Sequence, residues 1–201
     1  MSNNIVNFSE LNLSQFLLRA LDNMQFTKPT AIQAGAIPLM LEGRDIIAQA
    51  QTGTGKTAAF ALPILQRISL DSSLTQALIL APTRELAIQI AEQFASLSAC
   101  QREIKVAVLC GGQDYRPQLK QLRDGAHIVV GTPGRILDHL ERDSLKLNHL
   151  VTFVLDEADE MLRMGFIEDV ETILAKLPDN KQMALFSATM PSRIRQIANQ
   201  Y

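Results

Sequence analysis

The sequence predicts an α/β fold with a central parallel sheet covered by helices on both faces. Apolar runs such as ALILA at 77–81 contain no polar position, which is typical of parallel strands that are buried on both faces. Between such runs, the stretch Arg84–Ser98 places Leu86, Ile90 and Phe94 at helical spacing. A chain of 201 residues with 47% hydrophobic and 20% charged residues fits one globular domain.

Six strands are expected, and together they define the order of the sheet elements along the chain. They are Asp45–Gln49, Ala77–Ala81, Lys105–Cys110, His127–Val130, Thr152–Leu155 and Gln182–Phe186. Before the first strand, Ser14–Met24 and Thr30–Glu42 are expected to form helices that pack at the side of the sheet, and Arg193–Tyr201 is expected to form the last helix. The chain therefore divides into a helical segment at 1–43 and an α/β core at 44–201.

Composition excludes some classes of protein and leaves others open. The net charge of −2 does not provide the basic surface of a typical nucleic-acid binder, so any nucleic acid must be held by local groups and backbone amides, or by a basic part outside this chain. An apolar run of about 18 residues is lacking, and the opening residues do not resemble a secretory signal, so a cytoplasmic protein without a membrane span is expected. Cys100 and Cys110 are expected to be free thiols.

A phosphate-binding loop follows the first expected strand and opens a helix. Its residues are Ala50, Gln51, Thr52, Gly53, Thr54, Gly55, Lys56 and Thr57. Apart from Ala50 at the first glycine position, they fit the pattern of a phosphate loop. Gly53 and Gly55 allow a tight turn that points backbone N–H groups at phosphates. Lys56 should reach the β- and γ-phosphates, and Thr57 should bind Mg²⁺.

An acidic segment follows the apolar run TFVL at 152–155. With a phosphate loop present, an acid at the end of a second strand is expected to hold Mg²⁺, which is the role assigned to Asp156. Glu157 can orient or deprotonate the attacking water. The alternative is that these acids merely complement the dipole of a following helix, and this explanation stays open for Asp159.

Several segments together resemble the DEAD-box RNA helicase family. They are AQTGTGKT at 50–57, PTRELA at 82–87, GG at 111–112, TPGR at 132–135, DEAD at 156–159 and SAT at 187–189. The segment EMLRMGF at 160–166 is similar to the bacterial cold-shock branch. The resemblance runs from Phe8 to at least Thr189. It implies a RecA-like P-loop NTPase domain that couples ATP binding and hydrolysis to the unwinding of RNA.

The resemblance also implies an adenine-recognition segment before the first strand. Phe26, Pro29, Ile32 and Gln33 resemble this segment of the family. The resemblance implies that Phe26, Lys28 and Gln33 bind the nucleotide, with Gln33 recognising adenine, and that Phe8 stacks on the base. For Gln33 a capping box with Thr30 is a purely structural alternative. The family often has glycine where this sequence has Gln25. This departure precedes the proposed contact residues and is not expected to prevent adenine binding.

Two further sets of residues are implied by the resemblance. Ser187 and Thr189 would couple hydrolysis to strand separation through hydrogen bonds to the DEAD segment. Thr83 and Thr132 are also helix N-caps, with Pro133 at the first helical position, so capping and phosphate binding use the same geometry. The residues expected along the RNA backbone are Pro82, Thr83, Arg84, Gly112, Thr132, Pro133, Gly134 and Arg135.

The family's second RecA-like lobe, with its histidine- and arginine-rich motif, has no counterpart in this sequence. Because arginine supplied to the γ-phosphate is a large part of phosphoryl-transfer catalysis, this chain alone is expected to bind nucleotide with little turnover. The expected cofactors are ATP and Mg²⁺, and the expected partners are RNA and the second lobe. An ATP-gated RNA clamp and a DNA-acting P-loop ATPase are the alternatives.

Overall fold

The computed structural model describes residues 6–201 and confirms an α/β fold built on a parallel sheet. The six strands of this part of the chain run in the order β1-β6-β5-β2-β4-β3, and every neighbouring pair is parallel. Their bounds differ from the expected ones by one residue at most. They are β1 (Ile46–Gln49), β2 (Ala77–Leu80), β3 (Val106–Leu109), β4 (Ile128–Gly131), β5 (Thr152–Leu155) and β6 (Gln182–Ser187).

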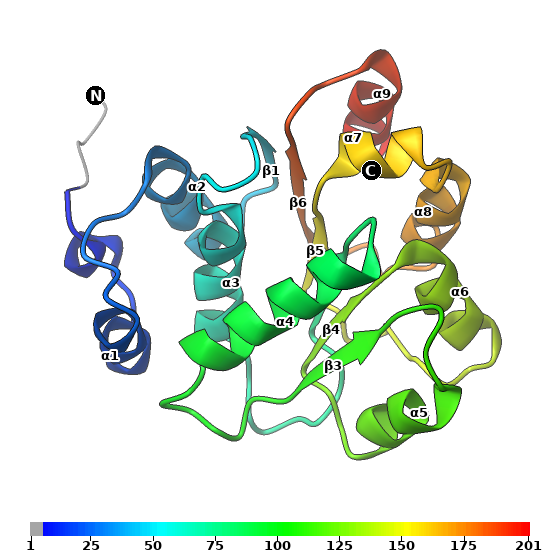
Figure 1. Cartoon of the computed structure of the whole chain (residues 1–201), viewed down its shortest axis with the longest axis horizontal. Helices are drawn as coiled ribbons and strands as arrows, with labels where there is room; N and C mark the ends of the chain where they lie inside the picture. The colour runs from blue at the N-terminus through cyan, green and yellow to red at the C-terminus, as the bar shows by residue number, and fades with distance from the viewer. Residues whose placement is uncertain (1–5) are drawn as a thin grey trace.

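Helices cover both faces of the sheet (Figure 1). One face carries α1 (Gln15–Asn23), α2 (Ala31–Leu41), α3 (Lys56–Arg67) and α4 (Arg84–Leu97), preceded by the 3-10 helix η1 (Phe8–Leu11). The other carries α6 (Pro133–Glu141), α7 (Ala158–Arg163), α8 (Ile167–Leu174) and α9 (Ser192–Gln200). Helix α5 (Tyr115–Arg123) lies beside the edge strand β3.

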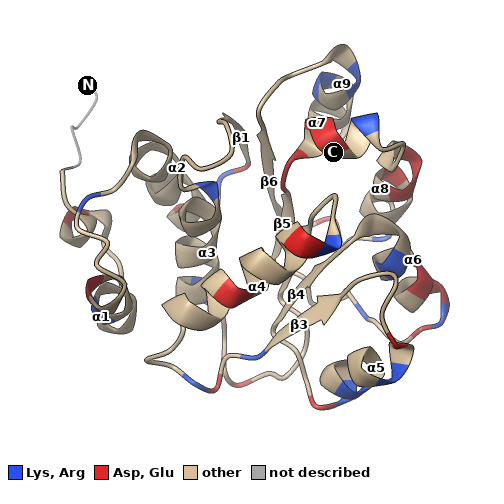
Figure 2. Cartoon of the chain, viewed as in Figure 1, with Lys and Arg blue, Asp and Glu red and all other residues tan. Residues whose placement is uncertain are grey.

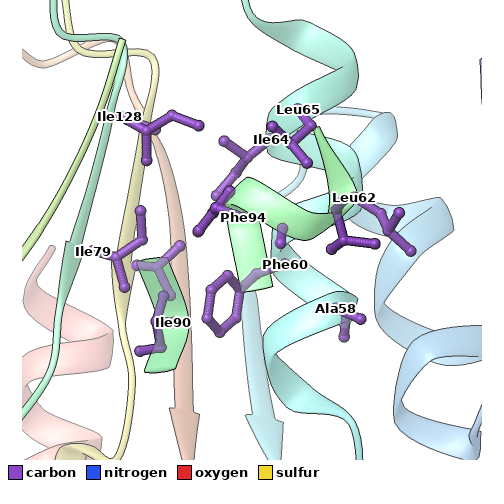
Figure 3. Close-up of a cluster of buried hydrophobic side chains, with 14 of the residues drawn as sticks. Ala58, Phe60, Leu62, Ile64, Leu65, Ile79, Ile90, Phe94 and Ile128 are labelled. Atoms are coloured by element: carbon purple, nitrogen blue, oxygen red, sulfur yellow. The ribbon is translucent and has the colours of Figure 1, made fainter. Parts of the chain in front are cut away.

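The unbroken apolar strands arise because each one supplies both cores. Successive side chains of a strand point to opposite faces. Accordingly, Ile79 joins the cluster under α3 and α4, whereas Leu78 joins the cluster under α6 to α9. In the first cluster the ring of Phe60 lies 6.2 Å from that of Phe94 and 5.3 Å from that of Phe186, between centroids (Figure 3 shows Phe60 and Phe94 facing the sheet).

The segment before β1 shares its core with the sheet. Its helix α2 packs against α3 and β1, and α1 packs against α4. Two glutamines add polar links: Gln66 accepts from the Ser14 backbone N–H at 2.8 Å, and Gln182 donates to the Met40 carbonyl at 3.0 Å. Residues of this segment therefore hold a fixed position beside the strand that precedes the phosphate loop. Residues 1–5 lie outside the described part of the chain.

Acidic and basic residues are intermixed along the helices, as Figure 2 shows. Within residues 6–201, no helix is both long enough and apolar enough to cross a bilayer.

Candidate nucleotide and RNA-backbone site

The strand order divides the carboxyl edge of the sheet into two halves. In a parallel sheet, the loops that leave the carboxyl ends of the strands meet along one edge. The neighbouring strands β1, β6 and β5 lead into the phosphate loop, the SAT segment and the DEAD segment. The neighbouring strands β2, β4 and β3 lead into the PTRELA, TPGR and GG segments. The three segments expected to bind nucleotide are thus adjacent at one half of the edge. The three segments expected to contact RNA are adjacent at the other half.

The phosphate loop has the backbone that its glycines predict. Gly53 and Gly55 have φ of 83° and 89°, in the left-handed region, and α3 begins directly afterwards at Lys56. A Cβ on Gly55 would lie 2.5 Å from Gln33 Nε2, so the position excludes a side chain by both conformation and space. The loop and the start of α2 are therefore packed against each other.

Lys56, the basic residue of this loop, is buried. Its side chain is 6% exposed, and Nζ lies 3.6 Å from Asp156 Oδ1 and 3.8 Å from Glu157 Oε1. Within residues 6–201 it finds no hydrogen-bond acceptor, although an ammonium group has three N–H bonds to donate. Buried donors without acceptors are rare because they are costly. The oxygens of a bound phosphate would supply what Lys56 lacks.

Asp156 directly follows β5, lies beside Lys56 and is almost completely buried. Burial raises the pKa of its carboxyl to about 6; the charge of Glu157 adds to this rise, and Lys56 opposes it. A buried carboxylate that is only partly neutralised favours a further cation. The described residues hold no group of three or more His, Cys, Asp or Glu side chains that could bind a metal by themselves. The oxygens of Asp156 and Thr57 suit Mg²⁺ that shares its other ligands with phosphates and water.

Glu157 occupies a strained position in front of α7. Its φ of 55° and ψ of 50° lie in the left-handed region, which non-glycine residues enter at a cost of about 1 kcal/mol or more. The Glu157 N–H donates to Asp156 Oδ1 at 2.9 Å, and its carboxylate accepts from the Thr52 hydroxyl at 3.0 Å. The turn thus aims the carboxylate at the phosphate loop. A simple dipole explanation fits Asp159 in the first helical turn better than it fits Glu157 or Asp156.

These groups surround one cleft of about 370 Å³. The cleft is lined by Thr52, Gly53, Gly55, Lys56, Thr57, Asp156 and Glu157, together with Leu86, Gln89 and Gln93 of α4. Sequence reasoning did not identify the three α4 residues. The i, i+4 spacing of Gln89 and Gln93, just after the PTRELA segment, was the available signal.

Gln33 uses both ends of its amide in this structure. Its Oε1 accepts from the Thr30 N–H at 2.9 Å, which forms the capping box with Thr30, and its Nε2 donates to the Gly55 carbonyl at 3.2 Å. Capping and contact with the phosphate loop are therefore simultaneous. An amide has a second N–H and a further lone pair, so adenine could still be bound. A cleft of about 560 Å³ borders this region at Thr30, Ile32 and Thr54.

The other residues expected at adenine lie in different environments. Phe8 is 5% exposed and packs in the first core cluster, so little of its ring is available for stacking in this structure. Phe26 is half-buried and Lys28 is exposed. Gln25 has φ of 59°, which gives a physical reason for the glycine that the family often has there. The adenine contacts of these residues stay predictions.

The DEAD and SAT segments are joined by hydrogen bonds. Asp159 Oδ2 accepts from the Thr189 hydroxyl at 2.7 Å and from the Thr189 N–H at 3.0 Å, and the Asp159 N–H donates to Ser187 Oγ at 3.1 Å. Burial alone would raise the pKa of Asp159, but the hydrogen bonds that its carboxylate accepts, those from Thr189 foremost, outweigh burial and lower this pKa. The resemblance implied hydrogen bonds between the SAT and DEAD segments but did not identify Asp159 as the partner, which lies 30 residues from Thr189 in the chain.

The residues expected along RNA lie at the other half of the sheet edge. Thr83 caps α4 by accepting from the Leu86 N–H at 3.2 Å. Thr132 holds the N-cap position of α6, but it makes no capping bond; its hydroxyl lies 3.5 Å from the Gly111 N–H. Arg84, Gly112 and Gly134 are exposed, Arg135 is half-buried, and Pro82 and Pro133 are buried. Exposed residues from three neighbouring loops thus share one edge of the sheet.

Behind this edge lies a buried polar group that sequence reasoning did not find. His139 of α6 is fully buried, and its imidazole stacks on the Tyr115 ring at 4.3 Å with an interplanar angle of 10°. Its Nδ1 lies 2.8 Å from Ser144 Oγ, and its Nε2 lies 3.3 Å from Gln118 Oε1. Burial lowers the pKa of His139 to about 4, and the charges of Arg135 and Arg142 add to this effect while Asp138 opposes it. His139 is consequently neutral near pH 7.

Acid should therefore destabilise the fold through His139. The folded-state pKa is near 4 against an ordinary value of 6.5, so the unfolded chain binds more protons between these values. The contribution of His139 to stability should be complete above pH 6.5 and fall as the pH approaches 4, by at most about 3 kcal/mol. Urea unfolding between pH 7 and 4.5 should show a steeper decline for wild type than for His139→Gln. His149→Gln at an exposed position is the control, and equal declines in all three proteins would contradict the assignment.

The fold and its loop define the class of P-loop NTPases, in which a strand, a glycine-rich loop and a helix bind phosphates. Within that class, the DEAD/DEAH box helicase model matches residues 30–197, so the chain belongs to the DEAD/DEAH box helicase family. This confirms the resemblance found in the sequence.

Individual relatives support the same family. The chain is 56% identical to the ATP-dependent RNA helicase DeaD of Buchnera aphidicola subsp. Schizaphis graminum, over 96% of this chain and 32% of that protein. It is 53% identical to the DEAD-box ATP-dependent RNA helicase CshA of Geobacillus kaustophilus, over 96% of this chain and 41% of that protein. A DEAD box protein of Methanococcus jannaschii has a similar structure, with a TM-score of 0.94 and 51% identity over 98% of this chain and 53% of its own. The chain spans about a third of the DeaD relative's length.

Proposed function

We propose that this chain is the ATP-binding lobe of an ATP-dependent RNA helicase. The observation that carries the proposal is the cluster of Lys56, Asp156 and Glu157, which places an unsatisfied ammonium group and two carboxylates around one cleft beside the phosphate loop. Family membership supports ATP as the nucleotide and RNA as the substrate. A second RecA-like lobe would complete the enzyme. A cytoplasmic location is predicted from the composition and the opening residues, and a role in cold stress or ribosome biogenesis is predicted from the resemblance.

The residues divide the chemical work. Lys56 and the loop N–H groups bind and orient the phosphates. Thr57 and Asp156 would hold Mg²⁺, which neutralises phosphate charge when it is bound. Glu157, kept beside the cleft by Thr52, would orient the attacking water and accept its proton. Asp159 would transmit structural changes at the nucleotide site to Ser187 and Thr189 through its hydrogen bonds to them.

RNA would lie along the second half of the sheet edge. The N-termini of α4 and α6 favour phosphate groups, and Arg84 and Arg135 add positive charge there. Contacts of this kind do not read base sequence. A chain with a net charge of −2 can therefore bind RNA locally without a basic face.

The adenine preference provides a test with this chain alone. With Mg²⁺ present, calorimetric titration should show ADP binding roughly tenfold or more tightly than GDP, because a good bidentate amide–base pair contributes about 1–3 kcal/mol to discrimination. Gln33→Ala should bring the ratio of the two affinities close to one. Gln33→Glu should do the same, although its carboxylate can still accept from the Thr30 N–H.

The two Gln33 variants distinguish recognition from capping. Gln196→Ala, at an exposed position of α9, is the control and should keep the wild-type ratio. If ADP and GDP bind alike in the wild type, the phosphate loop remains supported but Gln33 is only a cap. Stimulation of ATP hydrolysis in a two-lobed protein by DNA as strongly as by RNA would argue for a different polymer substrate.

A further inference from the structure

We call the half of the sheet edge that follows β2, β4 and β3 the RNA edge. The buried group behind it connects two of the segments expected to contact RNA there, the GG and TPGR segments. We call Tyr115, Gln118, His139 and Ser144 the His139 network. We propose that the His139 network positions Arg135 and the Gly111–Gln113 loop as one RNA-backbone site, so that His139 controls RNA affinity without touching RNA. The inference rests on the proposed function, because it assumes that RNA binds at this edge.

Gln118 ties the network to the start of the GG loop. Among the residues of α5, all of which the structure describes, only Gln118 is buried. Its Nε2 donates to the Cys110 carbonyl at 3.1 Å and lies 3.4 Å from the Asp114 carbonyl. Cys110 and Asp114 are the residues on either side of the loop 111–113. The amide oxygen is thereby turned toward His139 Nε2. The main anchor of α5 is thus a polar side chain whose orientation is set by the loop.

His139 completes the network in one protonation state. Because Gln118 Oε1 can only accept, His139 Nε2 must carry the hydrogen, which leaves Nδ1 as an acceptor. The single hydrogen of the Ser144 hydroxyl is shared between His139 Nδ1 at 2.8 Å and the His139 carbonyl at 3.0 Å. Ser144 Oγ in turn lies 3.1 Å from the Tyr115 hydroxyl, which can donate to it. Every nitrogen of the imidazole therefore has a partner. A buried polar network that is fully paired specifies one geometry, whereas a partly paired one is costly.

Tyr115 links the network to Arg135, because its ring contacts both His139 and the Arg135 guanidinium. The guanidinium carbon of Arg135 lies 5.5 Å from the centroid of the Tyr115 ring, whose position is fixed by stacking on His139. The Arg135 Nη1 and Nη2 atoms donate to the Gln113 carbonyl at 3.3 and 3.4 Å. Arg142 also lies over the ring, at 5.0 Å, but pairs with Asp138. Arg135 is thus held by a ring and by the GG loop together, and it has no carboxylate partner within residues 6–201.

The test measures binding of a fluorescent oligo-uridine to this chain at low salt. Arg135→Ala should weaken RNA affinity roughly tenfold because it removes a charged phosphate contact. His139→Leu should weaken it by a similar factor, since residues that modulate a site from a distance typically change affinity by this order. His139→Gln should stay within about threefold of wild type, because its amide can still donate to Gln118 Oε1. Leucine fills the space but leaves Gln118 and Ser144 without their partner.

A double variant separates positioning from general stabilisation. If His139 acts through Arg135, then Arg135→Ala/His139→Leu should bind RNA about as weakly as Arg135→Ala alone, which is a strongly non-additive result. The slope of log affinity against log salt should also fall by about 0.7 in both single variants, because each loses one phosphate contact. A lower melting temperature alone would not change that slope.

Each remaining outcome bears on one proposal. If Arg135→Ala weakens binding while His139→Leu does not, or if the two effects add, the positioning role is wrong and the RNA edge stands. If Arg135→Ala binds like wild type, or wild type binds no RNA, the RNA edge itself is wrong. Binding of Mg–ADP should be unchanged in every variant. Should His139→Leu fail to fold, Tyr115→Leu at a half-buried position takes its place in the same cycle, with the same expected results.

Discussion

Lys56→Ala should reduce the affinity of this chain for Mg–ADP by roughly 100-fold or more. Removing one member of a buried charge cluster typically costs 2–5 kcal/mol or more of binding free energy, which corresponds to such a factor. Lys56 Nζ is enclosed and has no hydrogen-bond acceptor within the described residues, so a bound phosphate would be its main partner. Calorimetric titration with ADP and Mg²⁺ measures the change directly.

The matched control removes the same side chain elsewhere. Lys146 is exposed and pairs with Asp143 at 3.2 Å, so Lys146→Ala should bind ADP like wild type. Exposed pairs of this kind contribute little to stability. If Lys56→Ala retained wild-type affinity, the lysine would be a partner of the two acids only, and the cleft would not be the phosphate site.

Local patterns in the sequence predicted the sheet and the phosphate loop well. Strand β2 could be predicted because its residues alternate between two buried faces, so that Leu78 and Ile79 are both apolar. The loop could be predicted because the left-handed φ of Gly53 and Gly55 favours glycine at these positions. Such patterns depend on residues that are close in the sequence, so they can be recognised without knowledge of the tertiary structure.

Contacts between distant segments could not be predicted in this way. The bond from Thr189 to Asp159 and the stacking of Tyr115 on His139 join residues that no periodicity relates. The hydrogen bond from Gln33 to the Gly55 carbonyl was not predicted either, because only the capping box with Thr30 is local in the sequence. Adenine recognition by Gln33 stays a prediction. Long-range polar bonds depend on the packing of whole elements.

The strand order places the proposed nucleotide site and the proposed RNA site next to each other along one edge of the sheet. Strands β5 and β2 are neighbours, so the DEAD segment after β5 and the PTRELA segment after β2 leave the sheet side by side. Helix α4, which begins in the PTRELA segment, also lines the nucleotide cleft through Gln89 and Gln93. Helix α4 is therefore a short physical route from the phosphates to the RNA edge.

Glu157→Gln should lower the RNA-stimulated ATP hydrolysis of a protein that carries this chain with a second lobe by roughly 10²- to 10⁴-fold, the range expected for loss of general-base catalysis. Glutamine keeps an oxygen that can accept from the Thr52 hydroxyl, so the turn and the affinity for ADP should change little. Initial rates of phosphate release, with and without RNA, give the comparison. Unwinding of a short RNA duplex should fall in parallel.

Glu160→Gln provides the matched control, because Glu160 lies in the first turn of α7 and pairs with Arg163 at the surface. It should hydrolyse ATP at the wild-type rate, which would show that one added amide near the DEAD segment is harmless. The two variants also separate chemistry from binding. If the Glu157→Gln protein binds ADP normally but does not hydrolyse ATP, the defect lies in the attack of water on the γ-phosphate. If hydrolysis and unwinding are unchanged, Glu157 has no part in the mechanism, and its left-handed backbone conformation has no functional explanation.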